Sequence, residues 1–320
     1  MVTSCGFGGD VLVQTLETYI ARIASIQDRP AFNLPKSKNI TLPSKRALFI
    51  NIPTISIGLL DSYELRKCGL FSLVAERNSI LGKVQDRFRN YDYQIALSRG
   101  LRGCIQHPSL SKELQSQLAE IHRQKLSQIP KHLSNLVYSS AAMRNQLQSS
   151  YPLTIEGPRE STMILDAVRQ IDKALLATQQ LDEPAELTFL TPYQETLDKY
   201  AVIGKLSYSM LNISQMLPIV TMQLKEYDDI IQCKKNRNKT RFNYLRNIFN
   251  QFFIGEIQPY IAKINSVYYD LEPYLNFTVT AHPEYQYPIK KYHQAFREAT
   301  LSHVEYWQGL FKRCGTSPNQ

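Results

Sequence analysis

The chain lacks several features that would assign a function at once. Its 320 residues contain no run of about 18 apolar residues, the length that a membrane-spanning helix requires. They also contain no Walker phosphate loop, no G-x-S-x-G nucleophile elbow and no H-E-x-x-H zinc motif. These absences argue against the common nucleotidase, α/β-hydrolase and zinc-protease classes. We therefore expect a non-enzymatic protein with no cofactor and no bound metal.

The titratable residues show no catalytic or metal-binding spacing either. No two of the histidines are spaced four residues apart as a metal-binding helix would require; they are His107, His122, His132, His282, His293 and His303. We interpret His303 as a core histidine, because it falls on the apolar stripe of the last predicted helix. The carboxylate pairs Glu195/Asp198 and Asp228/Asp229 are interpreted as helix-surface charge.

The composition is that of a globular protein with an excess of positive charge. Hydrophobic residues make up 43% of the chain and charged residues 20%, and 37 Lys and Arg against 28 Asp and Glu give a net charge of +9. A basic surface favours anionic partners such as nucleic acid, phospholipid head groups or acidic glycans. Charge does not choose among them, but the cellular compartment does.

The first residues suggest a compartment. Val2-Thr3-Ser4-Cys5 resembles a bacterial lipobox, in which small residues precede a cysteine that is lipidated and becomes the mature N-terminus. Residues 1–9 are then a lipobox remnant and a glycine-rich tether. No apolar signal region occurs before residue 10, so this interpretation places that signal upstream of the sequence. The alternative is an intracellular protein with an incidental cysteine at position 5.

A lipidated Cys5 leaves an even number of cysteines: Cys68, Cys104, Cys233 and Cys314. Four cysteines allow three pairings. We favour Cys68–Cys104 and Cys233–Cys314, which join neighbours within each half of the chain. The alternative is four separate buried thiols in a reducing compartment. Zinc is not expected, because no C-x-x-C or Cys/His pair has ligand spacing.

Apolar periodicity predicts an all-α fold, a multi-helix bundle that could divide into two helical halves at 10–150 and 151–314, with a tail at 315–320. At most one short extended segment is expected, near 47–52. Pro130 should end one helix, and Pro218 should kink or interrupt another.

The most unusual segment runs from Cys68 to Val84. As one helix it would place Arg77 in an otherwise apolar stripe; the other members of that stripe are Leu70, Val74, Leu81 and Val84. A buried arginine must be paired and hydrogen-bonded. It could clamp an anion in a polar pocket formed by Glu76, Arg77, Asn78 and Ser79. We favour the alternative, an internal arginine–carboxylate network that fixes helix packing.

A second candidate site is a basic run near a predicted helix N-terminus, with cations at Lys234, Lys235, Arg237, Lys239 and Arg241. Such a run could bind anions, because the helix dipole favours negative charge there. More often a run of this kind is solvated surface, and we favour that interpretation.

Three stretches resemble a known family: Leu59-Leu60-Asp61, Cys68-Gly69-Leu70 and Ala75-Glu76-Arg77-Asn78-Ser79 with Leu81-Gly82-Lys83-Val84. This pattern is similar to an uncharacterised gammaproteobacterial lipoprotein family, domain of unknown function 3080. The resemblance is most specific over residues 57–104. It implies an envelope lipoprotein, and it transfers no functional residues because the family has no assigned activity.

We therefore expect a lipid-anchored protein of the bacterial envelope that binds an envelope protein or an anionic envelope component, and not nucleic acid. Gly6 after Cys5 resembles lipoproteins of the outer membrane, with the domain facing the periplasm. One alternative is a carrier of a lipid or glycan in a tyrosine-rich cavity between helices. Another is an enzyme with a site near Glu76 and Arg77, and a more distant one is a cytoplasmic RNA binder.

Overall fold

The structure is a computed structural model, and it describes residues 11–55, 63–154, 157–179, 187–233 and 238–317. This part of the chain is helical and contains no β-strand, which confirms the all-α prediction. The extended segment expected near 47–52 forms no strand; the nearest β-type pairing is an isolated bridge between Ile40 and Ser149. No helix among these residues has both the length and the apolarity to cross a membrane.

The first part of the chain forms helices that are separated by irregular segments. They are α1 (Val11–Gln27), α3 (Phe71–Asn78), α4 (Ile80–Lys83), α5 (Arg87–Ile105), α6 (Lys112–Ser139) and α7 (Ala141–Leu147).

The second part continues in the same way, with short 3-10 turns and one π-helical segment, η4, between longer helices. These elements are α8 (Pro158–Gln179), η2 (Thr191–Tyr193), α9 (Gln194–Lys199), α10 (Val202–Glu226), η3 (Asp228–Ile230), α11 (Thr240–Ile248), η4 (Phe249–Ile257), α12 (Gln258–Leu271), η5 (Glu272–Tyr274), α13 (Phe277–Thr280) and α14 (Ile289–Cys314).

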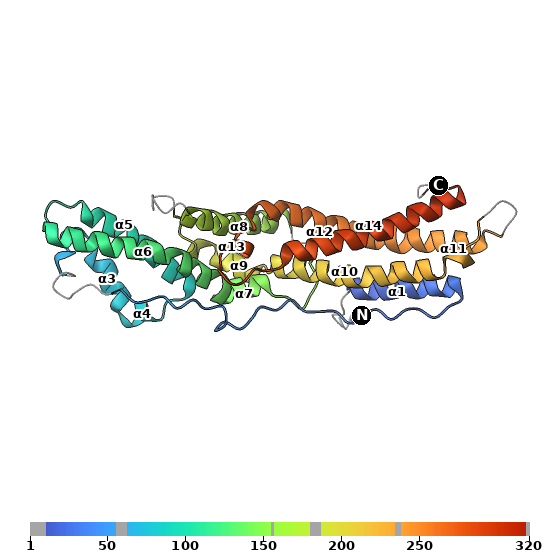
Figure 1. Cartoon of the computed structure of the whole chain (residues 1–320), viewed down its shortest axis with the longest axis horizontal. Helices are drawn as coiled ribbons and strands as arrows, with labels where there is room; N and C mark the ends of the chain where they lie inside the picture. The colour runs from blue at the N-terminus through green and yellow to red at the C-terminus, as the bar shows by residue number, and fades with distance from the viewer. Residues whose placement is uncertain (1–10, 56–62, 155–156, 180–186, 234–237, 318–320) are drawn as a thin grey trace, which may run out of the picture.

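The helices form an elongated bundle (Figure 1). The α5–α6 hairpin and the short helices α3 and α4 make one end, and α1, α10, α11 and the C-terminal part of α14 make the other. Between α1 and α3 the chain runs back along the bundle as an irregular segment, part of which, residues 28–55, is described. Side-chain amides of the bundle bind this segment: Asn135 Oδ1 accepts from the Ile50 amide at 2.8 Å, and its Nδ2 donates to the Ile50 carbonyl at 2.8 Å.

Two hydrophobic clusters lie along this length. The main cluster combines residues from both sides of the predicted boundary at 150, from Leu12 in α1 to Cys314 in α14. The smaller cluster fills the tip of the α5–α6 hairpin beneath α3; its buried residues are Leu65, Leu70, Leu97, Leu101, Cys104, Leu110, Leu114 and Leu118. Polar side chains of α5 and α6 lie between the two clusters, and these positions form the candidate site.

The ends of α5 and α6 follow from their capping residues. Asp86 caps α5, and its Oδ1 accepts from the amides of Phe88 at 2.8 Å and Arg89 at 3.1 Å. Ser111 caps α6, and its Oγ accepts from the Leu114 amide at 3.2 Å. These caps fix where the two helices begin, and so set the register of the residues that face each other in the hairpin.

The prediction that Pro130 ends a helix is wrong, because α6 continues from Lys112 to Ser139 with Pro130 inside it. Proline removes one backbone hydrogen bond and crowds the preceding turn. Ile129 and Leu133, on either side of Pro130, are fully buried, and their burial outweighs that local cost. Pro218 likewise lies within an uninterrupted helix, α10.

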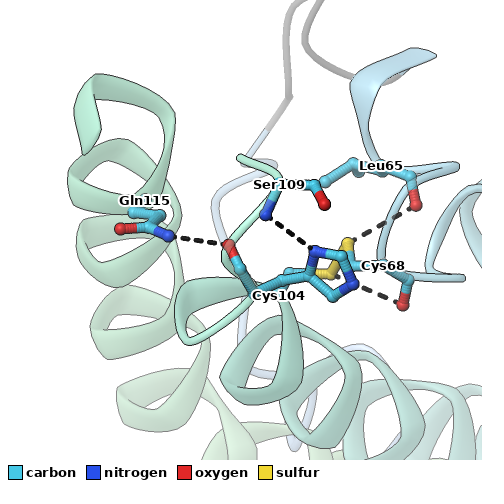
Figure 2. Close-up of a disulfide and its surroundings, with 6 residues drawn as sticks. Leu65, Cys68, Cys104, Ser109 and Gln115 are labelled. Atoms are coloured by element: carbon cyan, nitrogen blue, oxygen red, sulfur yellow. Dashed lines mark hydrogen bonds between the residues drawn. A yellow bond between two sulfur atoms is a disulfide. The ribbon is translucent and has the colours of Figure 1, made fainter. Parts of the chain in front are cut away.

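The favoured disulfide pairing occurs in the structure. Cys68 is bonded to Cys104 with a Cα–Cα distance of 5.2 Å, and Cys233 to Cys314 with a distance of 5.1 Å. The first bond joins the turn before α3 to the last turn of α5, close to the carbonyl of Leu65 and to the start of α6 at Gln115 (Figure 2). It therefore fixes α3 against the hairpin.

Candidate anion-binding cavity

A cavity of about 610 Å³ lies on the side of the α5–α6 hairpin. Its walls come from the irregular segment at residues 49–55, from α3, and from the facing sides of α5 and α6. Apolar side chains, including Val74, Leu97 and Ile121, share these walls with charged and amide side chains. This size is typical of a small-molecule site.

Arg77 of α3 is held in the cavity wall by neutral partners. Its Nη1 donates to the Gly82 carbonyl and, at 2.9 Å, to Oε1 of Gln85. Its Nη2 donates to Oδ1 of Asn90 at 2.8 Å, and the guanidinium lies 5.3 Å from the centre of the Tyr93 ring. None of these described partners is a carboxylate. Among the described residues, the predicted internal arginine–carboxylate network is therefore replaced by hydrogen bonds from Arg77 to neutral groups.

The hydrogen bonds of Arg77 determine the proton on His132 of α6. A guanidinium only donates, so the Asn90 atom that it contacts is the amide oxygen, and the Asn90 amide nitrogen faces Nδ1 of His132 at 3.1 Å. Nδ1 must then accept, and a neutral His132 carries its proton on Nε2. Nε2 is buried and has no hydrogen-bond partner among the described residues. His132 thus lines the cavity while its Nε2 is a buried donor without an acceptor among the described residues.

The cavity is electrostatically positive. Arg77, Arg87 and Lys125 line it, and no aspartate or glutamate in the described part of the chain does. Burial, together with the charges of Lys125, Arg77 and Arg87, lowers the pKa of His132 to about 4. Burial and the charge of Arg77 also lower the pKa of Lys125. The same cations that disfavour a further positive charge would stabilise a bound negative one.

Two glutamines of the cavity wall have buried oxygens without a partner. Gln94 and Gln128 are 6% and 7% exposed, and neither Oε1 has a hydrogen-bond partner among the described residues. Nε2 of Gln128 donates to the Pro53 carbonyl at 2.9 Å, which fixes the orientation of that amide. A buried acceptor without a donor is unfavourable by about 1–3 kcal/mol.

The structure divides the four residues of the predicted polar pocket. Arg77 and Asn78 line the cavity, whereas Glu76 and Ser79 are exposed and do not. The single helix predicted over 68–84 is wrong: α3 ends at Asn78, and the extended backbone of Ser79 separates it from α4. As a result Val84, predicted to share the buried stripe, is 75% exposed.

The remaining predicted site residues lie elsewhere or cannot be placed. Lys239 and Arg241 are exposed at the start of α11. Lys234, Lys235 and Arg237 lie outside the described residues. So does the predicted lipidation site, Cys5.

Sequence reasoning missed Arg87, Lys125 and His132, which come from α5 and α6. No local motif marks them, because they meet Arg77 only when the hairpin packs against α3. The cavity is also not tyrosine-rich, since Tyr93 is the one tyrosine among the described residues that line it. In the described part of the chain, no cluster of His, Cys, Asp or Glu has the geometry to hold a metal ion.

His303, interpreted from the sequence as a core residue, is fully buried between α1, α10 and α14. Trp307 Nε1 donates to its Nε2 at 3.1 Å, so Nδ1 carries the proton and donates to Thr221 Oγ1 at 2.9 Å. Burial lowers the pKa of His303 to about 3. This histidine stabilises helix packing and lies outside the cavity.

Comparison with known proteins places the chain in a family. The family model described as "Protein of unknown function (DUF3080)" matches residues 16–318, a span that includes the whole cavity wall. Neither a curated protein nor a solved structure matches the chain. The cavity must therefore be interpreted from its own chemistry, and the chain belongs to the DUF3080 family.

Proposed function

We propose that this protein is a binding protein whose ligand is a small anion held in the cavity between α3, α5 and α6. The observation that carries the proposal is uncompensated charge. Three cationic side chains line the cavity, and no carboxylate among the described residues does; Arg77 donates its hydrogen bonds to neutral acceptors. Clustered cations without counter-charge repel one another, and a bound anion relieves that repulsion.

Binding is favoured over catalysis at this site. The enzyme alternative relied on Glu76 acting beside Arg77, but the Glu76 side chain is exposed and does not line the cavity. A general acid or base needs a group that titrates near the working pH. Burial and the surrounding cations instead hold the pKa of His132 at about 4.

The test is a calorimetric titration of the protein with sulfate. Replacing Lys125 by Met removes one cavity charge and leaves the hydrogen bonds of Arg77 to Gly82, Gln85 and Asn90 in place. Replacing Arg77 by Met removes the charge at the centre of that network. Each substitution should weaken sulfate binding by about tenfold to a hundredfold. A hydrogen bond to a charged group contributes about 1.5–3 kcal/mol, and each 1.4 kcal/mol changes the affinity about tenfold. The matched control is Arg102→Met, an exposed arginine of α5 outside the cavity. Equal affinity in all four proteins would overturn the proposal.

We place this binding protein in the bacterial envelope, as a lipoprotein anchored in the outer membrane through Cys5 and facing the periplasm. Val2-Thr3-Ser4-Cys5 supports the anchor. The two disulfides support an oxidising compartment, because disulfides persist mainly outside the cytosol. The gammaproteobacterial origin implied by the sequence resemblance is part of the same proposal.

Mass spectrometry of the protein isolated from its native cells tests the anchor. A diacylglyceryl or triacyl group on Cys5 is the expected result, with the protein in the membrane fraction. Cys5→Ser should move it to the soluble fraction. An unmodified Cys5 accompanied by reduced thiols at the other four cysteines would contradict the envelope assignment, while the anion-binding proposal would still be tested by the sulfate titration.

A further inference from the structure

The buried apolar side chains of the α5–α6 hairpin belong to two separate clusters. At the end of the bundle (Figure 1), Leu97 of α5 and Leu118 of α6 pack in the smaller cluster. Further along the same helix, Ile129 belongs to the main cluster. The end of the bundle therefore has a hydrophobic core of its own. We call this end the tip and define it as residues 63–78 and 97–121.

Polar side chains lie between the tip cluster and the main cluster. Oγ of Ser98 contacts Nε2 of His122 at 3.1 Å across the hairpin. Gln94, one turn before Ser98, and Gln128 of α6 are buried, and neither Oε1 has a hydrogen-bond partner among the described residues. Buried polar groups without partners are destabilising. This layer therefore holds α5 and α6 together less strongly than the clusters on either side of it.

The helix α6 is weakest where it crosses this layer. Every residue from 119 to 127 is at least partly exposed, so this stretch of the helix buries no side chain fully. Pro130, just beyond it, has no amide hydrogen, so the helical hydrogen bond to the Leu126 carbonyl is missing. Segments with few buried contacts and incomplete backbone hydrogen bonding open at the lowest free energy.

Two hydrogen bonds that cross the boundary would break if the tip opened. Arg77, in the tip, donates to Oδ1 of Asn90 at 2.8 Å, and Arg99 donates to the Leu187 carbonyl. Water can replace both partners once the tip has moved away, so the net contribution of each bond is small.

The cavity spans the same boundary. Val74 and Ile121 line it from the tip, whereas residues 49–55 and Asn135 line it from the rest of the bundle. Opening of the tip would separate these walls and remove Arg77 from the cavity.

We infer that the tip opens as a cooperative unit while the rest of the bundle stays folded, and that an anion in the cavity closes the tip against the bundle. The closure rests on the proposed anion-binding function and adds a conformational response to it. An anion that contacts both walls binds only the closed tip, so binding shifts the equilibrium towards closure. Order at this end of the molecule then depends on whether the cavity is occupied.

Hydrogen–deuterium exchange of the intact oxidised protein measures opening separately for each helix. Two fully buried leucines give a matched pair of variants: Leu118 in the tip, and Leu217 of α10 in the main cluster. Leu217→Ala should speed exchange in α10 and α14 by about 30-fold or more and leave the tip amides unchanged, because opening of the tip does not expose Leu217. Leu118→Ala should speed exchange of the tip amides by a comparable factor.

A second measurement needs no substitution. In the wild-type protein the tip amides should exchange faster than those of α10 and α14. Their exchange should also depend less steeply on denaturant concentration, because opening of the tip exposes less surface than unfolding of the whole bundle.

Sulfate tests the closure. At a sulfate concentration 100 times its dissociation constant, exchange of the tip amides should slow by about 100-fold. At the same concentration Lys125→Met should reduce this slowing to about tenfold or less, because it weakens binding. Arg102→Met, a substitution at an exposed position of α5 outside the cavity, should retain the full effect.

The outcomes distinguish the inference from the function on which it rests. If Leu217→Ala speeds exchange in the tip and in α10 alike, or if Leu118→Ala unfolds the whole protein, the bundle opens as one unit and the inference is overturned. Sulfate that binds by calorimetry without slowing exchange in the tip also overturns it. Failure of sulfate to bind overturns the proposed function, whereas independent opening of the tip is still decided by the leucine pair.

Discussion

The protonation of His132 gives the most quantitative prediction for the cavity. In the free protein, burial and the charges of Lys125, Arg77 and Arg87 lower the pKa of His132 from 6.5 to about 4. A bound anion opposes that repulsion and raises the pKa again. The complex then binds a proton that the free protein does not, so affinity rises as the pH falls from about 6.5 and levels off below about 4.

If bound sulfate restores the ordinary pKa of 6.5, binding should be about 20-fold tighter at pH 5 than at pH 7. Sulfate stays fully ionised over this range, so the dependence belongs to the protein. The pKa of Lys125 is also lowered by burial and by Arg77, so substitution of His132 itself is needed to isolate the histidine contribution.

The assay is calorimetric titration with sulfate at several pH values between 5 and 7. His132→Asn removes the titrating ring while keeping an acceptor for Asn90, and it should lose most of the pH dependence. The control is His122→Asn on the same helix: His122 contacts Ser98 at 3.1 Å, does not line the cavity, and should leave the dependence unchanged. A flat affinity in the wild type, or a full pH dependence in His132→Asn, would refute the reasoning.

Three further predictions concern the support of the cavity and the core. Replacing Cys68 and Cys104 together by Ala should lower the free energy of unfolding by about 4 kcal/mol, the loop-entropy value for 36 residues. It should also weaken sulfate binding, because α3 is then no longer bonded to α5. Denaturant unfolding tests the first effect and calorimetry the second. Gly82→Ala should also weaken sulfate binding, because a Cβ there would collide with the backbone oxygens of Glu76 and Arg77; unchanged affinity would contradict it. Acid should destabilise the fold through His303. In the unfolded chain this histidine takes up a proton below pH 6.5, whereas in the folded protein it stays neutral until about pH 3. The free energy of unfolding should therefore fall by about 1.4 kcal/mol for each pH unit between these values. Denaturant unfolding at pH 6 and pH 5 should show a smaller fall in His303→Gln than in the wild type.

Local patterns were enough to predict the fold class and part of the core. In α11 and η4, for example, apolar side chains recur at helical spacing and are buried; they are Phe242, Leu245, Phe249 and Phe252. Short-range pairing within each half was also enough to favour the disulfide arrangement that the structure has. These features depend on which residues share a helix face or a chain segment, and sequence spacing gives that information directly.

The helix boundaries around α3 and Pro130 depended on the rest of the molecule. Pro130 is tolerated inside α6 because Ile129 and Leu133 are buried by other helices. The free energy of that burial depends on tertiary packing and cannot be obtained from the local sequence. Ser79 ends α3 with its Oγ accepting from the Gly82 amide at 3.0 Å. That break turns the chain back, so that the Gly82 carbonyl becomes a partner of Arg77.

The sequence by itself determined that the chain is helical, that it is basic, and that Arg77 lies close to apolar residues such as Leu70 and Val74. It did not determine what surrounds Arg77. Arg87, Lys125 and His132 are 10, 48 and 55 residues further along the chain, by subtraction of their numbers, and only the packing of α5 and α6 against α3 brings them to one cavity. Charge on a single residue is a property of the sequence, whereas uncompensated charge depends on which groups the tertiary structure brings together.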